Sequence, residues 1–160
     1  MGDCRRFHEF SGLVLKQFPH ASTLPIADVA GGKGFLRTAL HERGVNQVTT
    51  WDKCRSMPRR SNGYKYKWFD YKTAPDDYGL VLGMHPDEGT DHVIKFAARH
   101  KIPFAVCPCC VKPSAAAYHG IKEYQPWCRH LAALAQGLGM KVDVFDLRMR
   151  GCSTVIVGRP

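Results

Sequence analysis

The segment Asp28-Val-Ala-Gly-Gly-Lys-Gly34 constrains the fold of this chain more than any other segment. Residues 24–29 are apolar enough for a short buried strand. Leu36, Ala39 and Leu40 then follow one another at helical spacing. The glycines are therefore predicted to form a turn from a strand into a helix. Glycine suits such a turn because it accepts positive φ and lets a ligand approach the backbone, toward which the helix directs its free N–H groups.

An acidic residue after the next strand supports this interpretation. Residues 48–51 are predicted to form the second strand, and Asp52 follows it. In a doubly wound sheet, an acid at this place binds the hydroxyl pair of a ribose. The glycine pattern is Gly-Gly-x-Gly rather than the spaced pattern of dinucleotide-binding proteins. The alternative interpretation is an ordinary strand–turn–helix with a glycine-rich bend.

Strands and helices alternate along the chain until about residue 140. Besides the elements above, helices are predicted over residues 7–18, 90–100 and 127–138, and strands over 64–69, 80–84, 103–107, 141–145 and 153–157. Residues 111–125 are predicted to form a loop or lid. Alternation predicts a parallel sheet covered by helices, and the short final turn makes the last strand antiparallel. We expect a single α/β domain over residues 1–160, with a seven-stranded, mostly parallel, doubly wound sheet.

This pattern resembles the class I S-adenosylmethionine (SAM)-dependent methyltransferases. The resemblance is carried by Asp-x-Ala-Gly-Gly-Lys-Gly, by the acid after the second strand and by the antiparallel last strand. It implies SAM as the cofactor, with its methionine part on the glycine turn and its ribose on Asp52. The residues that the resemblance assigns to the cofactor are Asp28, Ala30, Gly31, Gly32, Gly34, Asp52, Asp70, Tyr71, Gly83 and Met84.

Two further strand ends are similar to a smaller group, the methyltransferases related to the tRNA acceptor-stem ribose 2′-O-methylating enzyme. Gly83-Met-His85 follows the fourth strand, and Pro108-Cys-Cys110 follows the fifth. The group continues Cys-Gly-Asp-Leu after its histidine, whereas this chain has Pro86-Asp-Glu-Gly89. This difference leaves the substrate and the catalytic group open.

His85 and Asp87 are the predicted catalytic residues. Methyl transfer requires a group that accepts the proton of the acceptor, and histidine titrates in the range that suits a general base. Asp87 is expected to orient His85 or to take the proton itself. Alternatively, His85 caps the strand or stacks on adenine.

The seven cysteines include the crowded trio Cys107, Cys109 and Cys110. Their odd number and uneven spacing do not indicate a disulfide framework, so we expect a reducing, cytoplasmic environment. Cys109 is predicted to bind the substrate, and the cysteines of the trio are interpreted as small buried residues that form the floor of the cofactor pocket. Two alternatives are a nucleophilic thiolate at Cys109 and a zinc site in which the trio is joined by His119 or Cys128. Because neighbouring strand residues point to opposite faces, we assign no metal.

A formal net charge of +9 favours a polyanionic partner, although it also fits plain solubility. We expect RNA as the partner. The predicted substrate-binding residues, besides Cys109, are Arg55, Arg59, Arg60, Lys65 and Lys67. No apolar run is long enough to cross a membrane, and we expect no secretory signal.

The predicted function is SAM-dependent methyl transfer to tRNA or rRNA, with a protein partner for substrate recognition also considered. The alternatives are methylation of a protein or small molecule, and a catalytically silent SAM-fold protein that binds RNA or assists ribosome assembly.

Overall fold

The structure is a computed structural model that describes residues 3–53, 62–111 and 120–160. Its centre is a seven-stranded sheet with the order β3-β2-β1-β4-β5-β7-β6. The strands are β1 (Ile26–Val29), β2 (Val48–Trp51), β3 (Tyr64–Lys65), β4 (Leu80–Met84), β5 (Phe104–Cys107), β6 (Lys141–Asp146) and β7 (Thr154–Arg159). β7 pairs antiparallel with β5 and β6, whereas the other pairs among the described strands are parallel. The predicted fold class and the antiparallel last strand are thus confirmed.

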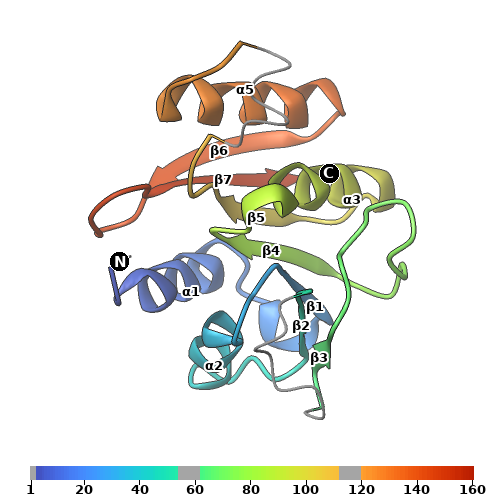
Figure 1. Cartoon of the computed structure of the whole chain (residues 1–160). Coiled ribbons are helices and arrows are strands. Elements are labelled where there is room, and N and C mark those ends of the chain that lie inside the picture. The colour runs from blue at the N-terminus through green and yellow to red at the C-terminus, as the bar shows by residue number, and fades with distance from the viewer. Residues whose placement is uncertain (1–2, 54–61, 112–119) are drawn as a thin grey trace.

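Helices cover both faces of this sheet (Figure 1). The α-helices are α1 (Arg6–Gln17), α2 (Phe35–His41), α3 (Thr90–His100) and α5 (Tyr124–Gly137), and the short 3-10 turns are η1 (Ala21–Thr23) and η2 (Asp87–Gly89). One core joins α1 and α2 to strand residues such as Ile26 and Leu82. A second core joins α3 and α5 to alternate residues such as Ala27 and Val81. Burial on both faces explains why the central strands are continuous apolar runs.

Two predicted elements differ from the structure. The third strand ends at Lys65, because the chain then turns and places Phe69 in the core. There the rings of Phe69 and Trp51 pack edge to face, with their centroids 5.3 Å apart. The alternating pattern over residues 64–69 therefore does not mark one long strand, and Tyr66 within it is exposed. Helix α5 begins at Tyr124, before the predicted start at Trp127. The predicted loop or lid over residues 111–125 lies largely outside the described residues.

The carboxyl ends of β1, β2, β4 and β5 meet at one edge of the sheet. The chain leaves β1 on one side for β2 and reaches β4 on the other side, so the order of strands reverses between β1 and β4. In open α/β sheets, ligands bind beyond the carboxyl ends of the strands at such a switch point. The topology therefore directs attention to the residues that follow these four strands.

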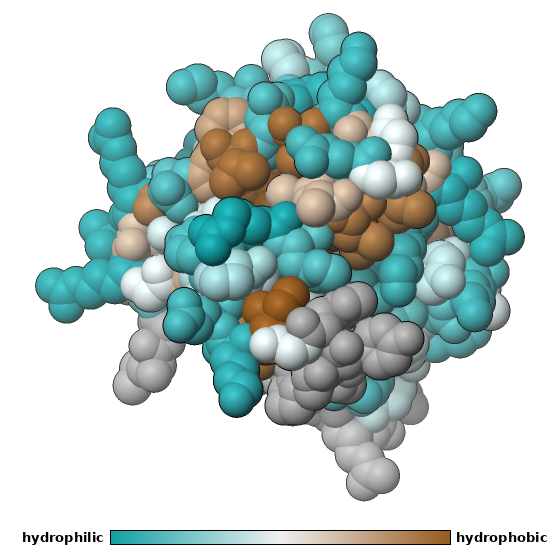
Figure 2. Space-filling view, turned by 90° about the horizontal axis from the view of Figure 1, so that it is seen from above, coloured by the Kyte–Doolittle hydropathy of each residue, from teal (hydrophilic) through white to brown (hydrophobic). Residues whose placement is uncertain are grey.

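The face of the molecule seen in Figure 2 is mainly hydrophilic. Figure 2 views the molecule from above, and its hydrophobic residues form separate patches among hydrophilic ones. No helix in the described part of the chain is long and apolar enough to cross a membrane.

Candidate functional site

The glycine turn is built around the carboxylate of Asp28. A Cβ at Gly31 would overlap that carboxylate, so only glycine fits there without movement. Gly32 has φ +56°, and a Cβ at this position would meet no atom within 4 Å. The turn therefore packs tightly against Asp28 on one side and is open at Gly32, as the approach of a ligand requires.

Asp28 itself is fully buried at the end of β1. Its Oδ2 accepts a 2.9 Å hydrogen bond from the hydroxyl of Thr50. Its Oδ1 has no hydrogen-bond partner among the described residues. Burial raises the pKa of this carboxyl from 3.8 to about 7. A buried carboxylate oxygen without a donor is costly, and a cationic ligand group is the kind of partner that offsets this cost.

Asp52 fastens the turn to the second strand. Its Oδ2 accepts a 2.7 Å hydrogen bond from the backbone N–H of Gly32. The backbone N–H of Gly31 donates to the carbonyl of Trp51 at 3.2 Å. The two predicted motifs, the glycine turn and the acid after the second strand, are thus joined directly.

A cavity of about 290 Å³ opens beside this junction. Asp52, Lys53 and His85 supply polar groups to its lining. The full lining is Val29, Ala30, Trp51, Asp52, Lys53, Trp68, Phe69, His85, Pro86, Asp87 and Glu88. The aromatic side chains of this wall were not predicted as site residues from the sequence. The aromatic–basic alternation of residues 64–69 was the signal that could have found two of them.

Some predicted cofactor residues do not line this cavity. Asp70 and Tyr71 instead meet His92: the Asp70 carboxylate lies 3.8 Å from Nδ1 of His92, which accepts a 3.2 Å hydrogen bond from the N–H of Tyr71. Because β3 ends at Lys65, Trp68 and Phe69 line the cavity instead of Asp70 and Tyr71. Gly83 and Met84 are buried within β4 and are also absent from the lining.

His85 is held in a strained backbone conformation, with φ +56°. Its N–H donates to the carbonyl of Cys107 at 2.9 Å, and its ring Nε2 lies 2.9 Å from the carbonyl oxygen of Cys152. A carbonyl only accepts hydrogen bonds, so Nε2 carries the ring proton and Nδ1 of the neutral ring is an acceptor. Burial lowers the pKa of His85 below 6.5, which keeps the ring neutral at pH 7. The orienting contact expected from Asp87 is thus made by Cys152.

A second cavity, of about 570 Å³, also reaches His85. Its lining is Asp3, Cys4, Arg5, His85, Cys109, Arg150, Gly151 and Cys152. Asp3 ties this wall together, since its carboxylate accepts hydrogen bonds from the Arg5 guanidinium at 2.8 Å and from the Arg150 N–H at 3.1 Å. The first cavity borders the glycine turn, the second borders Cys109, and His85 lines both.

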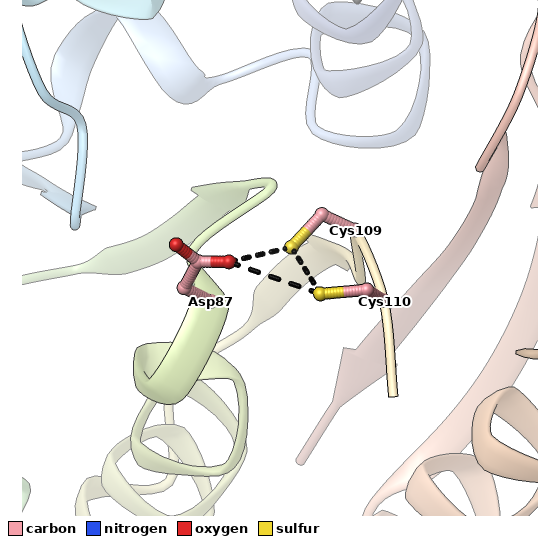
Figure 3. Close-up of side chains that lie close together, drawn as sticks. All are labelled: Asp87, Cys109 and Cys110. Atoms are coloured by element: carbon pink, nitrogen blue, oxygen red, sulfur yellow. Dashed lines mark hydrogen bonds between the residues drawn. The ribbon is translucent and has the colours of Figure 1, made fainter. Parts of the chain in front are cut away.

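Cys109 and Cys110 lie with Asp87 where β4 and β5 end (Figure 3). Sγ of Cys109 is 2.9 Å from Oδ1 of Asp87 and 3.4 Å from Sγ of Cys110. The expectation that these neighbouring cysteines point to opposite faces was therefore wrong, because both residues follow the strand rather than lie in it. Burial, together with the hydrogen bond to Asp87, raises the pKa of the Cys109 thiol. A protonated thiol does not favour the nucleophilic alternative.

The four-ligand zinc set considered from the sequence is not assembled as expected. Cys107 is buried and directs its thiol to the carbonyl of Cys152 at 3.4 Å. Cys128 is buried in α5, and His119 lies outside the described residues.

The predicted RNA-contacting residues are described in part. Arg55, Arg59 and Arg60 lie outside the described residues. Lys65 and Lys67 are exposed, and Nζ of Lys65 lies 4.7 Å from the ring centroid of Trp51. Lys53 makes the same contact with Trp68, also at 4.7 Å. Basic side chains therefore lie against the aromatic wall of the first cavity.

The fold is that of the class I SAM-dependent methyltransferases. The structure is similar to a SAM-dependent methyltransferase from Aquifex aeolicus, with a TM-score of 0.62 and 12% identity over 98% of this chain and 93% of the other. It is also similar to the plantazolicin methyltransferase BpumL, solved with a monoazolic desmethylPZN analogue and SAH, with a TM-score of 0.63 and 10% identity over 98% of this chain and 85% of the other.

Human N-acetylserotonin methyltransferase, solved with SAM, aligns with a TM-score of 0.56 and 14% identity over 93% of this chain. This chain spans about half (51%) of that protein's length. At these identities the similarity defines the fold alone. No protein-family model matches the sequence, and no curated protein matches it.

Proposed function

We propose that residues 1–160 form one SAM-dependent methyltransferase domain that acts on RNA. The observation that carries this proposal is that two cavities share His85 in their linings. A methyltransferase needs a cofactor site and an acceptor site that meet at the reacting atoms. The cavity beside the glycine turn suits the cofactor, and the cavity beside Cys109 and Arg150 suits the acceptor.

The residues present fit SAM. Asp28 has a buried oxygen without a donor among the described residues, which suits the ammonium of the methionine part. Asp52 lines the cavity and offers a carboxylate to the ribose hydroxyls. Trp51, Trp68 and Phe69 provide an apolar wall for the adenine ring. The cofactor supplies a methyl group bound to a positively charged sulfur.

His85 is the group that would accept the proton of the acceptor. Its Nδ1 is the basic atom of the neutral ring, because Nε2–H is engaged by the carbonyl of Cys152. The same contact fixes the ring orientation, so the base is already aligned when the acceptor binds. The proton then leaves through the imidazolium, which returns it to solvent.

Charge supports RNA as the acceptor. The chain has a net charge of +9, and Lys53 and Lys65 stack against the tryptophans of the first cavity. Basic residues beside aromatic rings suit phosphates and bases. A small-molecule or peptide-derived acceptor is the second candidate, since two proteins of this fold are named for N-acetylserotonin and plantazolicin.

Two measurements test the proposal in sequence. Calorimetric titration with SAM tests the cofactor, with Asp52→Ala as the variant and Asp70→Ala, outside the cavity lining, as the matched control. Transfer of labelled methyl from SAM to total RNA, followed by nucleoside analysis, then tests the acceptor, with a small-molecule extract in parallel. RNA binding without SAM binding would instead identify a catalytically silent scaffold, and label only in the extract would favour the second candidate.

A further inference from the structure

Asp87, Cys109 and Cys110 are brought together by the pairing of β4 with β5. The two strands are parallel, and Met84 pairs with Cys107 at their carboxyl ends. The residues that follow each strand therefore emerge side by side. Asp87 adopts φ +51° at the start of η2, which is uncommon for a residue other than glycine. This backbone conformation accompanies the carboxylate's position opposite the two thiols (Figure 3).

The three ligand atoms approximate one face of a tetrahedron. The distances are 3.4 Å between the two Sγ atoms, and 2.9 Å and 3.9 Å from Oδ1 of Asp87 to Sγ of Cys109 and of Cys110. In tetrahedral zinc sites, with Zn–S of about 2.3 Å and Zn–O of about 2.0–2.2 Å, two sulfurs lie about 3.8 Å apart and a sulfur and an oxygen about 3.6 Å apart. Side-chain adjustments of less than about 1 Å would convert the observed triangle into zinc coordination.

We propose that Asp87, Cys109 and Cys110 bind one zinc ion. Two thiolates with one carboxylate make a soft, anionic ligand set that favours zinc over magnesium or calcium. Asp87 and Cys110 are exposed and Cys109 is half-buried, so an ion reaches the site from solvent. Binding replaces the two thiol protons, which pass to the solvent, and forms two Zn–S bonds and one Zn–O bond.

The position of the site suggests what the ion does. The described residues supply three ligand atoms, and this set leaves the fourth zinc position open, as in catalytic rather than structural zinc sites. Asp87 lines the first cavity and Cys109 lines the second, so an ion held by both residues would border both cavities. The open position would take a hydroxyl or thiol of the acceptor and lower its pKa, so that its proton passes to His85, the base proposed above, and the more nucleophilic anion stays on the ion. This role rests on the proposed methyl transfer, whereas zinc binding itself does not.

Cobalt provides a direct test. The full-length protein is reduced, stripped of metal with a chelator and titrated with Co²⁺ alone. We expect one equivalent to produce a thiolate-to-cobalt charge-transfer band and the strong visible bands of tetrahedral cobalt, which one equivalent of Zn²⁺ removes. Cys109→Ser and Cys110→Ser should each weaken zinc binding by at least about tenfold, and Asp87→Asn should also weaken it. Circular dichroism and thermal unfolding check that these variants are folded.

Cys4→Ser is the matched control, because Cys4 is an exposed thiol that lines the second cavity outside the three-residue cluster. The absence of a thiolate band in the reduced parent protein would overturn the proposal. Unchanged zinc affinity in both cysteine variants, or an equal loss in Cys4→Ser, would overturn it as well.

Parallel assays separate this proposal from the methyltransferase assignment. Stoichiometric zinc binding without methyl transfer would sustain the zinc site and count against the enzyme. Full methyl transfer by a protein that binds no zinc would overturn the zinc site and support the enzyme.

Discussion

The backbone N–H of Gly32 donates a 2.7 Å hydrogen bond to Oδ2 of Asp52. This interaction joins the open position of the glycine turn to the carboxylate that lines the first cavity. Asp52 therefore both holds the turn and lines the cavity. Loss of the carboxylate should disturb both parts of the proposed cofactor site together.

Asp52→Ala should lower the affinity for SAM by roughly 1–3 kcal/mol, the cost of hydrogen bonds left unmade. Isothermal titration calorimetry measures this loss. The same substitution should reduce the affinity for a SAM analogue without ribose hydroxyls by less than it reduces the affinity for SAM. An equal loss for both ligands would mean that Asp52 acts only by holding the turn. Asp70→Ala should leave both affinities unchanged.

Gly31→Ala should destabilise the fold by about 1–3 kcal/mol, because the new methyl group would overlap the Asp28 carboxylate. That carboxylate is not free to move, since it is buried and bonded to Thr50. Chemical denaturation measures the free energy of unfolding. Gly137→Ala is the control: its Cβ would meet nothing within 4 Å at the end of α5, so this variant should be neutral or slightly stabilised. Equal stability of the two variants would contradict the tight turn.

Asp28 should make stability depend on pH. Its pKa is raised by burial from 3.8 to about 7, so between these values the folded state holds a proton that the unfolded state has lost. The free energy of unfolding should therefore fall as pH rises from about 4 to about 7, because the unfolded state binds fewer protons there. Asp28→Asn should remove this contribution. Denaturation of both proteins across the pH range measures it as the difference between their free energies of unfolding. An identical pH dependence would show that Asp28 is ionised in the folded protein.

His85→Ala should reduce turnover by about 10²–10⁴-fold, the usual contribution of a general base, and leave SAM affinity within a few fold. His85→Asn keeps much of the size and a hydrogen-bond donor for the Cys152 carbonyl but has no basic ring nitrogen, so it should be equally slow. Single-turnover methyl transfer measures the rate. His20→Asn, at an exposed position, is the control. Normal turnover in both His85 variants would reduce His85 to a structural role at the end of β4.

RNA binding should depend on Lys65 and Lys67 and on the basic residues that precede them in the sequence. In the multiple variant, Lys65, Lys67, Arg55, Arg59 and Arg60 are all replaced with Gln. Its affinity for RNA of any sequence should be lower. The slope of log affinity against log salt concentration should become shallower by about 0.7–0.9 for each phosphate that is no longer neutralised. Filter binding across salt concentrations measures the slope. Lys141→Gln, on the opposite edge strand β6, should have no such effect. An unaltered slope in the multiple variant would place any RNA on another surface.

Local patterns were enough to predict most of the fold. The glycine turn, Asp52 and the alternation of apolar strands with amphipathic helices depend on residues close together in the chain. The antiparallel last strand followed from the short turn before it. His85 was predicted at the edge where it lies, because the end of a strand in a parallel sheet is defined by sequence alone.

The interactions within the site depended on the tertiary structure. Strand order pairs β4 with β5 and sets Asp87 against Cys109 and Cys110, and β7 brings the Cys152 carbonyl to His85. The turn after β3 places Trp68, rather than Asp70, at the cavity. These interactions join residues from different segments of the chain. Local periodicity predicts which residues form a strand, whereas the packing of strands and helices decides which strand ends meet and which side chains face each other.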